Sequence, residues 1–135
     1  ASEFIFPYED NVFDFVFLTS VFTHMLPDEV KRYFSEISRV LKDGGTLFGT
    51  FFLINEESRQ CLEADISNQK FQRQENYWTT DKKVPETAVA YDEDFIKNLF
   101  EINNLSIELP IHFGSWCGRK TFLSYQDIVI AKKLD

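Results

Sequence analysis

The sequence predicts an α/β fold in which strands and helices alternate along a single domain and the last strand runs antiparallel to its neighbours. The first observation behind this prediction is that apolar runs typical of strands alternate with segments of helical periodicity. The second is that the last strand-like run, residues 127–131, follows a connection too short for a parallel crossover. The 135 residues fit one domain, and 44% of them are hydrophobic, which is enough to bury a core.

The first predicted strand covers residues 13–18, whose sequence FDFVFL is nearly continuous in apolar residues after its one acid. Such a run is typical of a strand that is buried on both faces. A helix is predicted next, because Pro27 suits a first helical turn and Asp43-Gly44-Gly45 can end a helix in a left-handed conformation. The apolar residues of this helix recur three and four positions apart and form one stripe that faces the sheet: Val30, Tyr33, Phe34, Ile37, Val40 and Leu41.

A second strand is predicted over residues 46–54, directly after the two glycines. Residues 13–54 therefore predict a strand, a crossover helix and a parallel strand. Asn55 is expected to cap a short helix that ends near Ala64. Residues 65–90 combine polar residues with scattered aromatics in no clear period, and we interpret them as an excursion over the ligand-binding edge of the sheet.

The chain is predicted to end in a helix and a hairpin. Asp92 is expected to cap the helix, and Asn103-Asn104 can end it in a left-handed turn. The next strand is predicted over residues 107–113. A glycine-containing loop then leads into the strand at residues 127–131, which completes the hairpin.

The composition argues against nucleic-acid and membrane partners. The 22 acidic and 14 basic residues give a net charge of −8, and no stretch gathers Lys or Arg into a phosphate-binding surface. The longest apolar run, residues 46–54, is well short of the roughly 20 residues that a membrane span requires, and no secretory signal precedes it. Cys61 and Cys117 lie in unlike sequence contexts and are expected to be reduced thiols, so we predict a soluble, cytoplasmic protein.

Three stretches of the chain carry a family pattern: PYEDNVFDFV at residues 7–16, SVFTH at 20–24 and RVLKDGGTL at 39–47. Together they resemble class I S-adenosylmethionine-dependent methyltransferases, and the resemblance spans most of the first 54 residues. It implies a Rossmann-like sheet with the strand order 3-2-1-4-5-7-6. Residues 13–19 would be the fourth strand of that sheet, and residues 127–133 would be its antiparallel seventh strand.

The resemblance also implies that residues 1–135 are the C-terminal half of a methyltransferase domain, with strands four to seven. The glycine-rich turn and the ribose-binding acid that hold the cofactor in this family have no counterpart in these residues, and the chain begins with Ala1. S-adenosylmethionine would then be the cofactor of the complete protein, and the fragment alone is expected to be inactive. Residues 13–19 are expected to form an exposed edge strand through which copies of the fragment self-associate.

In open α/β sheets, ligands bind beyond the carboxyl ends of the parallel strands. Thr19, Ser20 and Phe22 follow the first predicted strand and are expected to bind the cofactor. His24 is the candidate catalytic base for a hydroxyl or amine acceptor, and a role in packing or capping the following turn is the alternative. His112, the only other histidine, lies inside a predicted strand and is interpreted as structural, so no metal site is predicted.

The acceptor pocket is expected to have aromatic walls, which exclude water and attract the cationic sulfonium. Three aromatic side chains are predicted to bind the substrate: Tyr91, Trp116 and Tyr125. Their placement in the core is the alternative. Arg119 lies in a glycine-flanked loop and is expected to hold a polar or anionic substrate, although an ordinary hairpin loop would have the same composition. Glu57, in the first turn of a predicted helix, is explained by the helix dipole.

The leading functional hypothesis is methyl transfer from S-adenosylmethionine to a small-molecule acceptor. A nicotinamide-dependent oxidoreductase is one alternative, but such enzymes usually close their sheet with another parallel strand. A non-catalytic interaction domain with a methyltransferase-like sheet is another. The sequence does not identify the acceptor atom, because fold and cofactor class do not fix the substrate, and oxygen, nitrogen and carbon all stay open.

Overall fold

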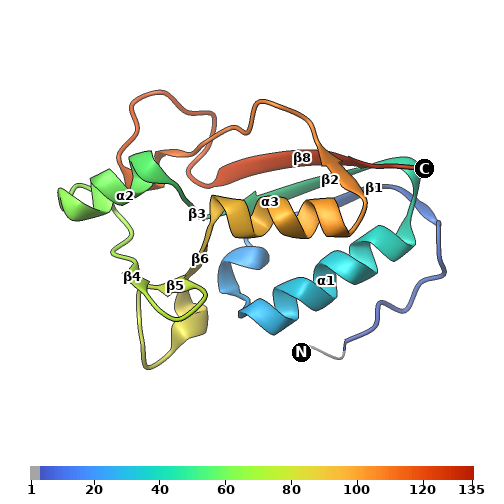
Figure 1. Cartoon of the computed structure of the whole chain (residues 1–135), viewed down its shortest axis with the longest axis horizontal. Coiled ribbons are helices and arrows are strands. Elements are labelled where there is room, and N and C mark those ends of the chain that lie inside the picture. Colours follow the sequence, from blue (N-terminus) through green and yellow to red (C-terminus); the bar gives the residue numbers. More distant parts are fainter. Residues whose placement is uncertain (1–3) are drawn as a thin grey trace.

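The main β-sheet has four strands in the order β1-β2-β8-β7. The computed structural model, which describes residues 4–135, places β1 parallel to β2 and places β8 antiparallel to both β2 and β7 (Figure 1). The predicted order of strands four, five, seven and six and the antiparallel last strand are therefore confirmed. The bounds of these strands are Phe13–Leu18 for β1, Leu41–Phe51 for β2, Leu105–Ile107 for β7 and Asp127–Lys133 for β8.

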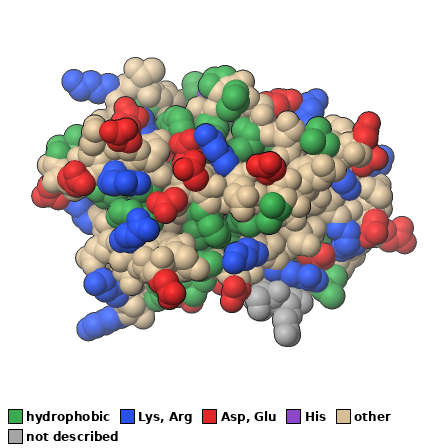
Figure 2. All heavy atoms as spheres, viewed as in Figure 1, with side chains coloured by type: hydrophobic (Ala, Val, Ile, Leu, Met, Phe, Trp, Pro, Cys, Tyr) green, Lys and Arg blue, Asp and Glu red, His purple; other side chains and the backbone are tan. Residues whose placement is uncertain are grey.

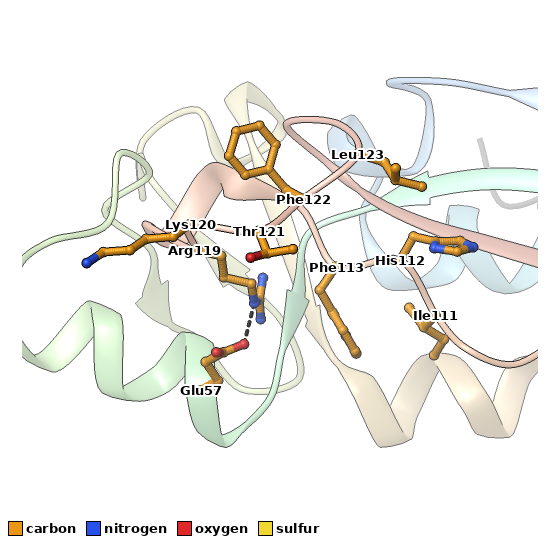
Figure 3. A pocket seen from close by; sticks show the side chains of 9 residues that line it. All are labelled: Glu57, Ile111, His112, Phe113, Arg119, Lys120, Thr121, Phe122 and Leu123. Atoms are coloured by element: carbon orange, nitrogen blue, oxygen red, sulfur yellow. Dashed lines mark hydrogen bonds and ion pairs between the residues drawn. The ribbon is translucent and has the colours of Figure 1, made fainter.

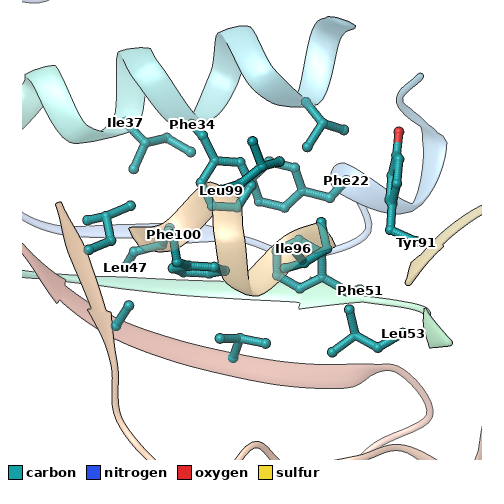
Figure 4. Close-up of a cluster of buried hydrophobic side chains, with 14 of the residues drawn as sticks. Phe22, Phe34, Ile37, Leu47, Phe51, Leu53, Tyr91, Ile96, Leu99 and Phe100 are labelled. Carbon is teal, nitrogen blue, oxygen red and sulfur yellow. The ribbon is translucent and has the colours of Figure 1, made fainter. Parts of the chain in front are cut away.

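Two helices pack against one face of the main sheet. Helix α1 covers Pro27–Val40 and α3 covers Glu93–Ile102, and Figure 4 shows both of them on the same side of β2 and β8. The predicted stripe of α1 is confirmed in its central members, since Val30, Phe34 and Ile37 are fully buried. Burial of these side chains against the sheet stabilises the helix more than its intrinsic propensity does.

Aromatic rings form the centre of the core between the helices and the sheet (Figure 4). Phe22 stacks on Phe51 with ring centroids 4.8 Å apart and also lies against Phe34 at 5.3 Å. Phe100 of α3 meets Phe34 edge-on at 4.8 Å. Each such pair contributes about 0.5–1.5 kcal/mol beyond the area it buries, so the core links the loop after β1 to both helices.

The junction of α1 and β2 differs from the prediction. The strand begins at Leu41, before the glycines rather than after them, and it ends at Phe51 instead of residue 54. The pairing with β1 shifts register between Phe13 and Phe15, and Gly44 takes up the irregularity with a φ of +79°. The two glycines therefore form a bulge inside the strand, which explains why a stop signal for the helix also delayed the predicted start of the strand.

A second small sheet, with the order β3-β6-β5-β4, lies beside the main sheet (Figure 1). Its strands are β3 (Leu53–Ile54), β4 (Gln72–Arg73), β5 (Trp78–Thr79) and β6 (Val89–Asp92). Residues 65–90 were expected to have no regular pattern, and this sheet was not predicted. Three of its strands are only two residues long, so they are too short for alternation of apolar and polar residues to be recognised.

Helix α2 covers Glu56–Glu63, and the predicted cap is confirmed. The Asn55 side chain accepts a hydrogen bond from the backbone N–H of Ser58 at 3.0 Å, and the Ser58 hydroxyl lies 2.8 Å from the backbone N of Asn55. At α3, Asp92 occupies the cap position but its carboxylate accepts the Trp78 indole N–H at 3.2 Å and makes no capping bond. The left-handed turn after α3 is present at Asn104, whose φ is +62°.

Strand β7 is shorter and begins earlier than predicted, at Leu105–Ile107 instead of residues 107–113. Pro110 has no N–H to donate, which interrupts the ladder with β8. Pairing resumes at His112, which exchanges two backbone hydrogen bonds with Ile128, at 3.1 and 2.8 Å. The segment after β7 therefore stays close to β8 without forming a continuous strand.

The face of the main sheet opposite the helices is largely apolar. The buried Leu47 of β2 and Val129 of β8 face the helices. Because side chains alternate along a strand, the residues directly before and after each of them face away from the helices. We call the following residues the bare sheet face: Phe15, Phe17, Phe48, Ile128 and Ile130. Phe15 is 53% exposed and Phe17 is 57% exposed, and β1 is an edge strand within the described part of the chain, as predicted.

Candidate functional site

The carboxyl end of β1 leads into a tight turn at Thr19 and Ser20, both of which are exposed. Ser20 has a φ of +56°, and its backbone N–H donates to the Thr50 hydroxyl of β2 at 2.9 Å. The Gln126 side-chain amide, just before β8, donates to the Ser20 hydroxyl at 3.1 Å. Three segments far apart in the sequence therefore meet at this edge of the sheet, with Ser20 in the middle.

Phe22 and His24 occupy opposite sides of the short 3-10 helix η1, Phe22–His24. Phe22 is 1% exposed and belongs to the aromatic core, so its ring supports the turn from below. His24 is exposed, and its Nδ1 lies 3.0 Å from the carbonyl oxygen of Glu86. A carbonyl can only accept, so Nδ1 carries the proton in this contact, and Nε2 of the neutral ring is left with a lone pair.

Tyr91 lies on β6 and is 1% exposed. Its hydroxyl donates to the carbonyl oxygen of Met25 at 2.6 Å, and its ring stacks on Phe95 at 5.3 Å. Burial raises the pKa of the Tyr91 hydroxyl above its ordinary value, and the nearby Glu29 raises it further. Tyr91 is thus a neutral hydrogen-bond donor that joins β6 to the segment after η1, and its role in substrate binding stays a prediction.

Trp116 and Asp127 form a buried hydrogen-bonded pair. Trp116 lies in the 3-10 helix η3, Ser115–Cys117, and its indole N–H donates to Oδ2 of Asp127 at 3.0 Å. The same carboxylate accepts the backbone N–H groups of Leu53 at 2.7 Å and Gly114 at 2.6 Å. Asp127 therefore joins the start of β3, the loop before η3 and the indole at one point, and we call this group the Asp127 node.

The electrostatics of the Asp127 node are a balance of opposed effects. Burial raises the pKa of the Asp127 carboxyl to about 6, although the N–H donors of Gly114, Leu53 and Trp116 oppose the shift. Arg119 adds a weaker opposing effect, with its Nη1 at 3.5 Å from Oδ1 of Asp127. The Asp127 carboxyl therefore gains or loses its proton near pH 6, a pH at which many proteins stay folded.

Arg119 is held by the protein on several sides. Its side chain is 6% exposed, its Nε donates to the Glu57 carboxylate, and its Nη1 donates to the carbonyl oxygen of Gly114 at 3.0 Å. The guanidinium also lies over the Phe113 ring, 4.9 Å from the centroid. Glu57 was explained from the sequence by the helix dipole alone, and the structure gives it a second role as the partner of Arg119.

A cavity of about 520 Å³ opens beside this ion pair (Figure 3). Figure 3 shows Glu57 and Arg119 at one end of the cavity and His112 with Ile111 at the other. The remaining lining residues are Phe113, Lys120, Thr121, Phe122 and Leu123. The cavity has the Glu57–Arg119 ion pair and Lys120 at one end and apolar side chains along the rest, and among the predicted substrate residues it contains only Arg119.

Tyr125 does not line that cavity, and its ring lies edge-on to Phe52, with centroids 6.2 Å apart. It is 39% exposed, and its hydroxyl accepts a hydrogen bond from the Gln69 side-chain amide at 2.9 Å. Its carbonyl oxygen accepts the backbone N–H of Trp116 at 3.1 Å. The structure therefore places Tyr125 beside Gln69 and Phe52, whereas Arg119 faces the cavity.

A family model described as "Methyltransferase domain" matches residues 2–49. Among solved structures, a S-adenosylmethionine-dependent methyltransferase from Methanosarcina mazei superposes with a TM-score of 0.62 at 22% identity, over 98% of this chain and 64% of that one. The chain has a class I methyltransferase fold. The resemblance inferred from the sequence is thereby confirmed.

Two other solved structures match nearly the whole chain. The 1,6-didemethyltoxoflavin-N1-methyltransferase of Burkholderia thailandensis, solved with 1,6-didemethyltoxoflavin and S-adenosylhomocysteine, has a TM-score of 0.60 at 13% identity and is 48% covered by 99% of this chain. The PH0226 protein of Pyrococcus horikoshii has a TM-score of 0.61 at 17% identity and is 54% covered by 94% of this chain. The chain spans about half to two thirds of the length of these structures.

The Asp127 node is the main feature of this methyltransferase fold that the sequence did not reveal as a site. Asp127 was read only as the first residue of the last strand. The signal that could have found it is the single acid at the start of an otherwise apolar run, since a buried carboxylate requires N–H partners. The residues from Phe4 to Asp135 contain no cluster of three or more His, Cys, Asp or Glu side chains arranged to hold a metal ion.

Proposed function

We propose that this protein transfers a methyl group from S-adenosylmethionine to a small-molecule acceptor. The observation that carries the proposal is the strand order β1-β2-β8-β7 with β8 reversed, in a chain whose residues 2–49 match a methyltransferase model. S-adenosylmethionine as the cofactor is supported by the S-adenosylhomocysteine in the Burkholderia thailandensis structure. The reversed β8 argues against an oxidoreductase sheet that closes with a parallel strand.

The proposed cofactor side of the site is the turn after β1. Thr19 and Ser20 are exposed beyond the carboxyl end of the strand, which is where ligands of open α/β sheets bind. Phe22 holds this turn on the aromatic core. The described residues include no strand followed by a glycine-rich turn, so they supply only part of the cofactor's contacts, and we propose that residues 1–135 alone are inactive.

His24 is the proposed general base for a hydroxyl or amine acceptor. The contact between Nδ1 and the Glu86 carbonyl orients the ring, and Nε2 is then free to accept a proton. The bound cofactor would supply an electrophilic methyl group on a cationic sulfonium. The chain's own contribution is to hold the acceptor in line with that methyl group and to exclude water.

On the proposed acceptor side, Tyr125 and Arg119 are the predicted residues with access to a surface or cavity. Trp116 is buried and would act by fixing the loop that carries the other two. Tyr91 is buried as well and would act by joining β6 to the segment after η1. A small molecule fits better than a nucleic acid, since Lys and Arg are interspersed with Asp and Glu on the face that carries α1 and α3 (Figure 2). No helix within residues 4–135 combines the length and apolar character of a membrane span.

The unpaired Cys61 and Cys117 support the further proposal that the protein works in a reducing cytoplasm. We also propose that the 135 residues self-associate through the strand at residues 13–19. The support for this proposal is the position of β1 at the edge of the sheet, together with the exposure of Phe15 and Phe17 on the bare sheet face.

Binding titrations on the natural full-length protein test the main proposal. S-adenosylhomocysteine is expected to bind with a Kd of about 10 μM, which corresponds to about 7 kcal/mol, and NADH is expected not to bind. Binding of NADH without S-adenosylhomocysteine would support the oxidoreductase alternative. Failure of both ligands to bind would leave a non-catalytic interaction domain, and methyl transfer by residues 1–135 alone would contradict the proposed inactivity.

A further inference from the structure

The two cysteines of the chain, which lie in unlike sequence contexts, come together in the fold. Cys61 is on α2 and Cys117 is at the end of η3. Cys117 is fully buried in a second apolar cluster that also contains Trp116 and Phe52, and Cys61 packs against that cluster. The structure thus brings two thiols that are far apart in the sequence into one apolar cluster, on two separate elements.

The two thiols differ in accessibility. Cys117 is 0% exposed, and burial raises the pKa of its thiol to about 11; Arg119 opposes the shift and the neighbouring Cys61 adds to it. Cys61 is half-buried and can be reached from solvent. A small reagent from solvent would therefore react with Cys61 before it reaches the buried Cys117.

The turn after α2 is hydrogen-bonded to both of the elements that carry the cysteines. Its backbone N–H at Ile66 donates to the carbonyl oxygen of Cys61 at 3.1 Å. Two positions further on, the N–H of Asn68 donates to the carbonyl oxygen of Trp116 at 3.0 Å, and the Ser67 hydroxyl contacts the same oxygen at 3.3 Å. One short turn is thus hydrogen-bonded to both elements, which keeps α2 and η3 next to each other around the two thiols.

We propose that Cys61 and Cys117 form a reversible intramolecular disulfide when the protein is exposed to hydrogen peroxide. The Cys61 thiolate attacks one peroxide oxygen and breaks the O–O bond, which gives a sulfenic acid and one water. The Cys117 sulfur then attacks the Cys61 sulfur and displaces its oxygen as a second water. Two thiols lose two electrons and two protons, and one peroxide is reduced to two waters.

The disulfide would cross-link α2 to η3. Its formation does not depend on the proposed methyl transfer, so the two proposals fail separately. η3 lies between Gly114, which donates to the Asp127 node, and Arg119, which pairs with Glu57 of α2. If the acceptor side lies where we propose, the oxidised form holds that loop against α2 by a covalent bond in addition to the ion pair.

Peptide mapping tests the proposal. The full-length reduced protein is treated with one equivalent of hydrogen peroxide, free thiols are then blocked, and the protein is digested with trypsin. We expect peptide 60–70 to be joined to peptide 98–119 in most chains, with a mass two hydrogens below the sum of the two, and to be released by dithiothreitol. Cys61→Ser is the control, since this half-buried position tolerates the change, and it should abolish the linked species.

The outcomes separate the proposal from its alternatives. Cys117→Ser should also abolish the link and leave Cys61 carrying peroxide oxygens that Cys117 can no longer remove. If Cys117→Ser does not fold, Cys61→Ser alone decides the matter. Three outcomes in the wild type would overturn the proposal. Cys61 could stay reduced, it could accumulate oxygen without forming a disulfide, or it could form a disulfide with another chain instead of with Cys117.

Discussion

The carboxylate of Asp127 accepts hydrogen bonds from Leu53, Gly114 and the Trp116 indole. The partners lie on two segments, β3 and the loop that forms η3, and the loss of a buried acceptor leaves each donor unpaired at a cost of about 1–3 kcal/mol. The charge of Asp127 itself is costly to bury, which is why its pKa is raised to about 6. The same residue therefore organises the ligand edge and makes it sensitive to pH.

The stability of the protein should depend on pH through Asp127. Its pKa is raised in the folded state, so the folded state favours the protonated form; this contribution to stability is fully present below about pH 4 and is lost as the pH rises through about 6. Relative to Asp127→Asn, the free energy of unfolding of the wild type should increase by about 1–3 kcal/mol between pH 7 and pH 4. Urea unfolding of both proteins at each pH measures the difference.

The comparison with Asp127→Asn cancels the contributions of the other carboxyl groups to the pH dependence of the free energy of unfolding. Glu36, for example, has its pKa lowered by the hydrogen bond from Arg39, which gives a slope of opposite sign in both proteins. This slope cancels in the difference between them. A difference that stays flat from pH 7 to pH 4 would show that Asp127 titrates at its ordinary value.

His24→Gln tests the proposed base. Glutamine can keep a hydrogen bond to the Glu86 carbonyl but cannot accept a proton from the acceptor, so kcat should fall by about 100-fold for a hydroxyl or amine acceptor. The Kd for S-adenosylhomocysteine should not change, because His24 is assigned to proton transfer alone. Steady-state kinetics and a binding titration on the full-length variant measure both quantities. An unchanged kcat would return His24 to the alternative of packing against the Glu86 turn.

At the scale of elements, the α1–β2 junction depends on two glycines for different reasons. Gly44 has a φ of +79° with open space around its Cα, whereas a Cβ on Gly45 would lie 2.8 Å from the Lys42 carbonyl oxygen and 3.2 Å from that of Asp14. Gly44→Ala should therefore cost about 1 kcal/mol in stability. Gly45→Ala should cost more, about 2–3 kcal/mol, since backbone atoms must move. Equal losses for the two variants in urea unfolding would contradict this assignment.

The elements that the sequence predicted well are those with local signals. The unit from β1 to β2 could be recognised from an apolar run, a stripe at helical spacing and two glycines, all within neighbouring residues. The second sheet could not, because its pairing, such as Leu53 with Tyr91, depends on contacts far apart in the sequence. The Asp127 node was missed for the same reason, since the partners of its carboxylate lie on separate segments.

The site residues show the same division. The turn at Ser20 was predicted from its position after a strand, and the structure places it at the carboxyl end of β1; its part in ligand binding stays a prediction. Residue type alone does not predict burial, so Tyr91 and Trp116 were expected either in the wall of the pocket or in the core, and both are buried. Phe22, which was expected to bind the cofactor, is buried as well. The pairing of Arg119 with Glu57 needed the fold, which brings α2 next to the loop before β8.

At the scale of the whole molecule, the bare sheet face makes association testable. Phe15 and Phe17 lie on an edge strand, and Phe17 stacks on Phe48 at 4.9 Å, so burial of these rings by a second copy would remove a continuous aromatic surface from water. We expect the 135-residue chain to scatter light as a dimer or larger species at high concentration. Phe15→Ser combined with Phe17→Ser should give a monomer.

Leu109→Ser is the matched control for this experiment. Leu109 is 77% exposed but lies in the segment after β7, away from β1, so its replacement should leave the association unchanged. Amide exchange adds a second measurement, since pairing of β1 with another copy should slow exchange at Phe15 and Phe17. A wild-type monomer whose amides at these positions exchange freely would contradict the proposed interface.

Strands β3 and β6 lie side by side and in parallel, with Leu53 opposite Tyr91. The long segment between them therefore leaves the end of β3 and returns to the start of the neighbouring strand β6. Extending such a segment is inexpensive, since each doubling of a flexible loop costs only about 0.6 kcal/mol. Residues can therefore be added between the fixed contacts of this segment, such as Glu57 with Arg119 and Asn68 with Trp116, without moving the Phe22–Phe51 stack.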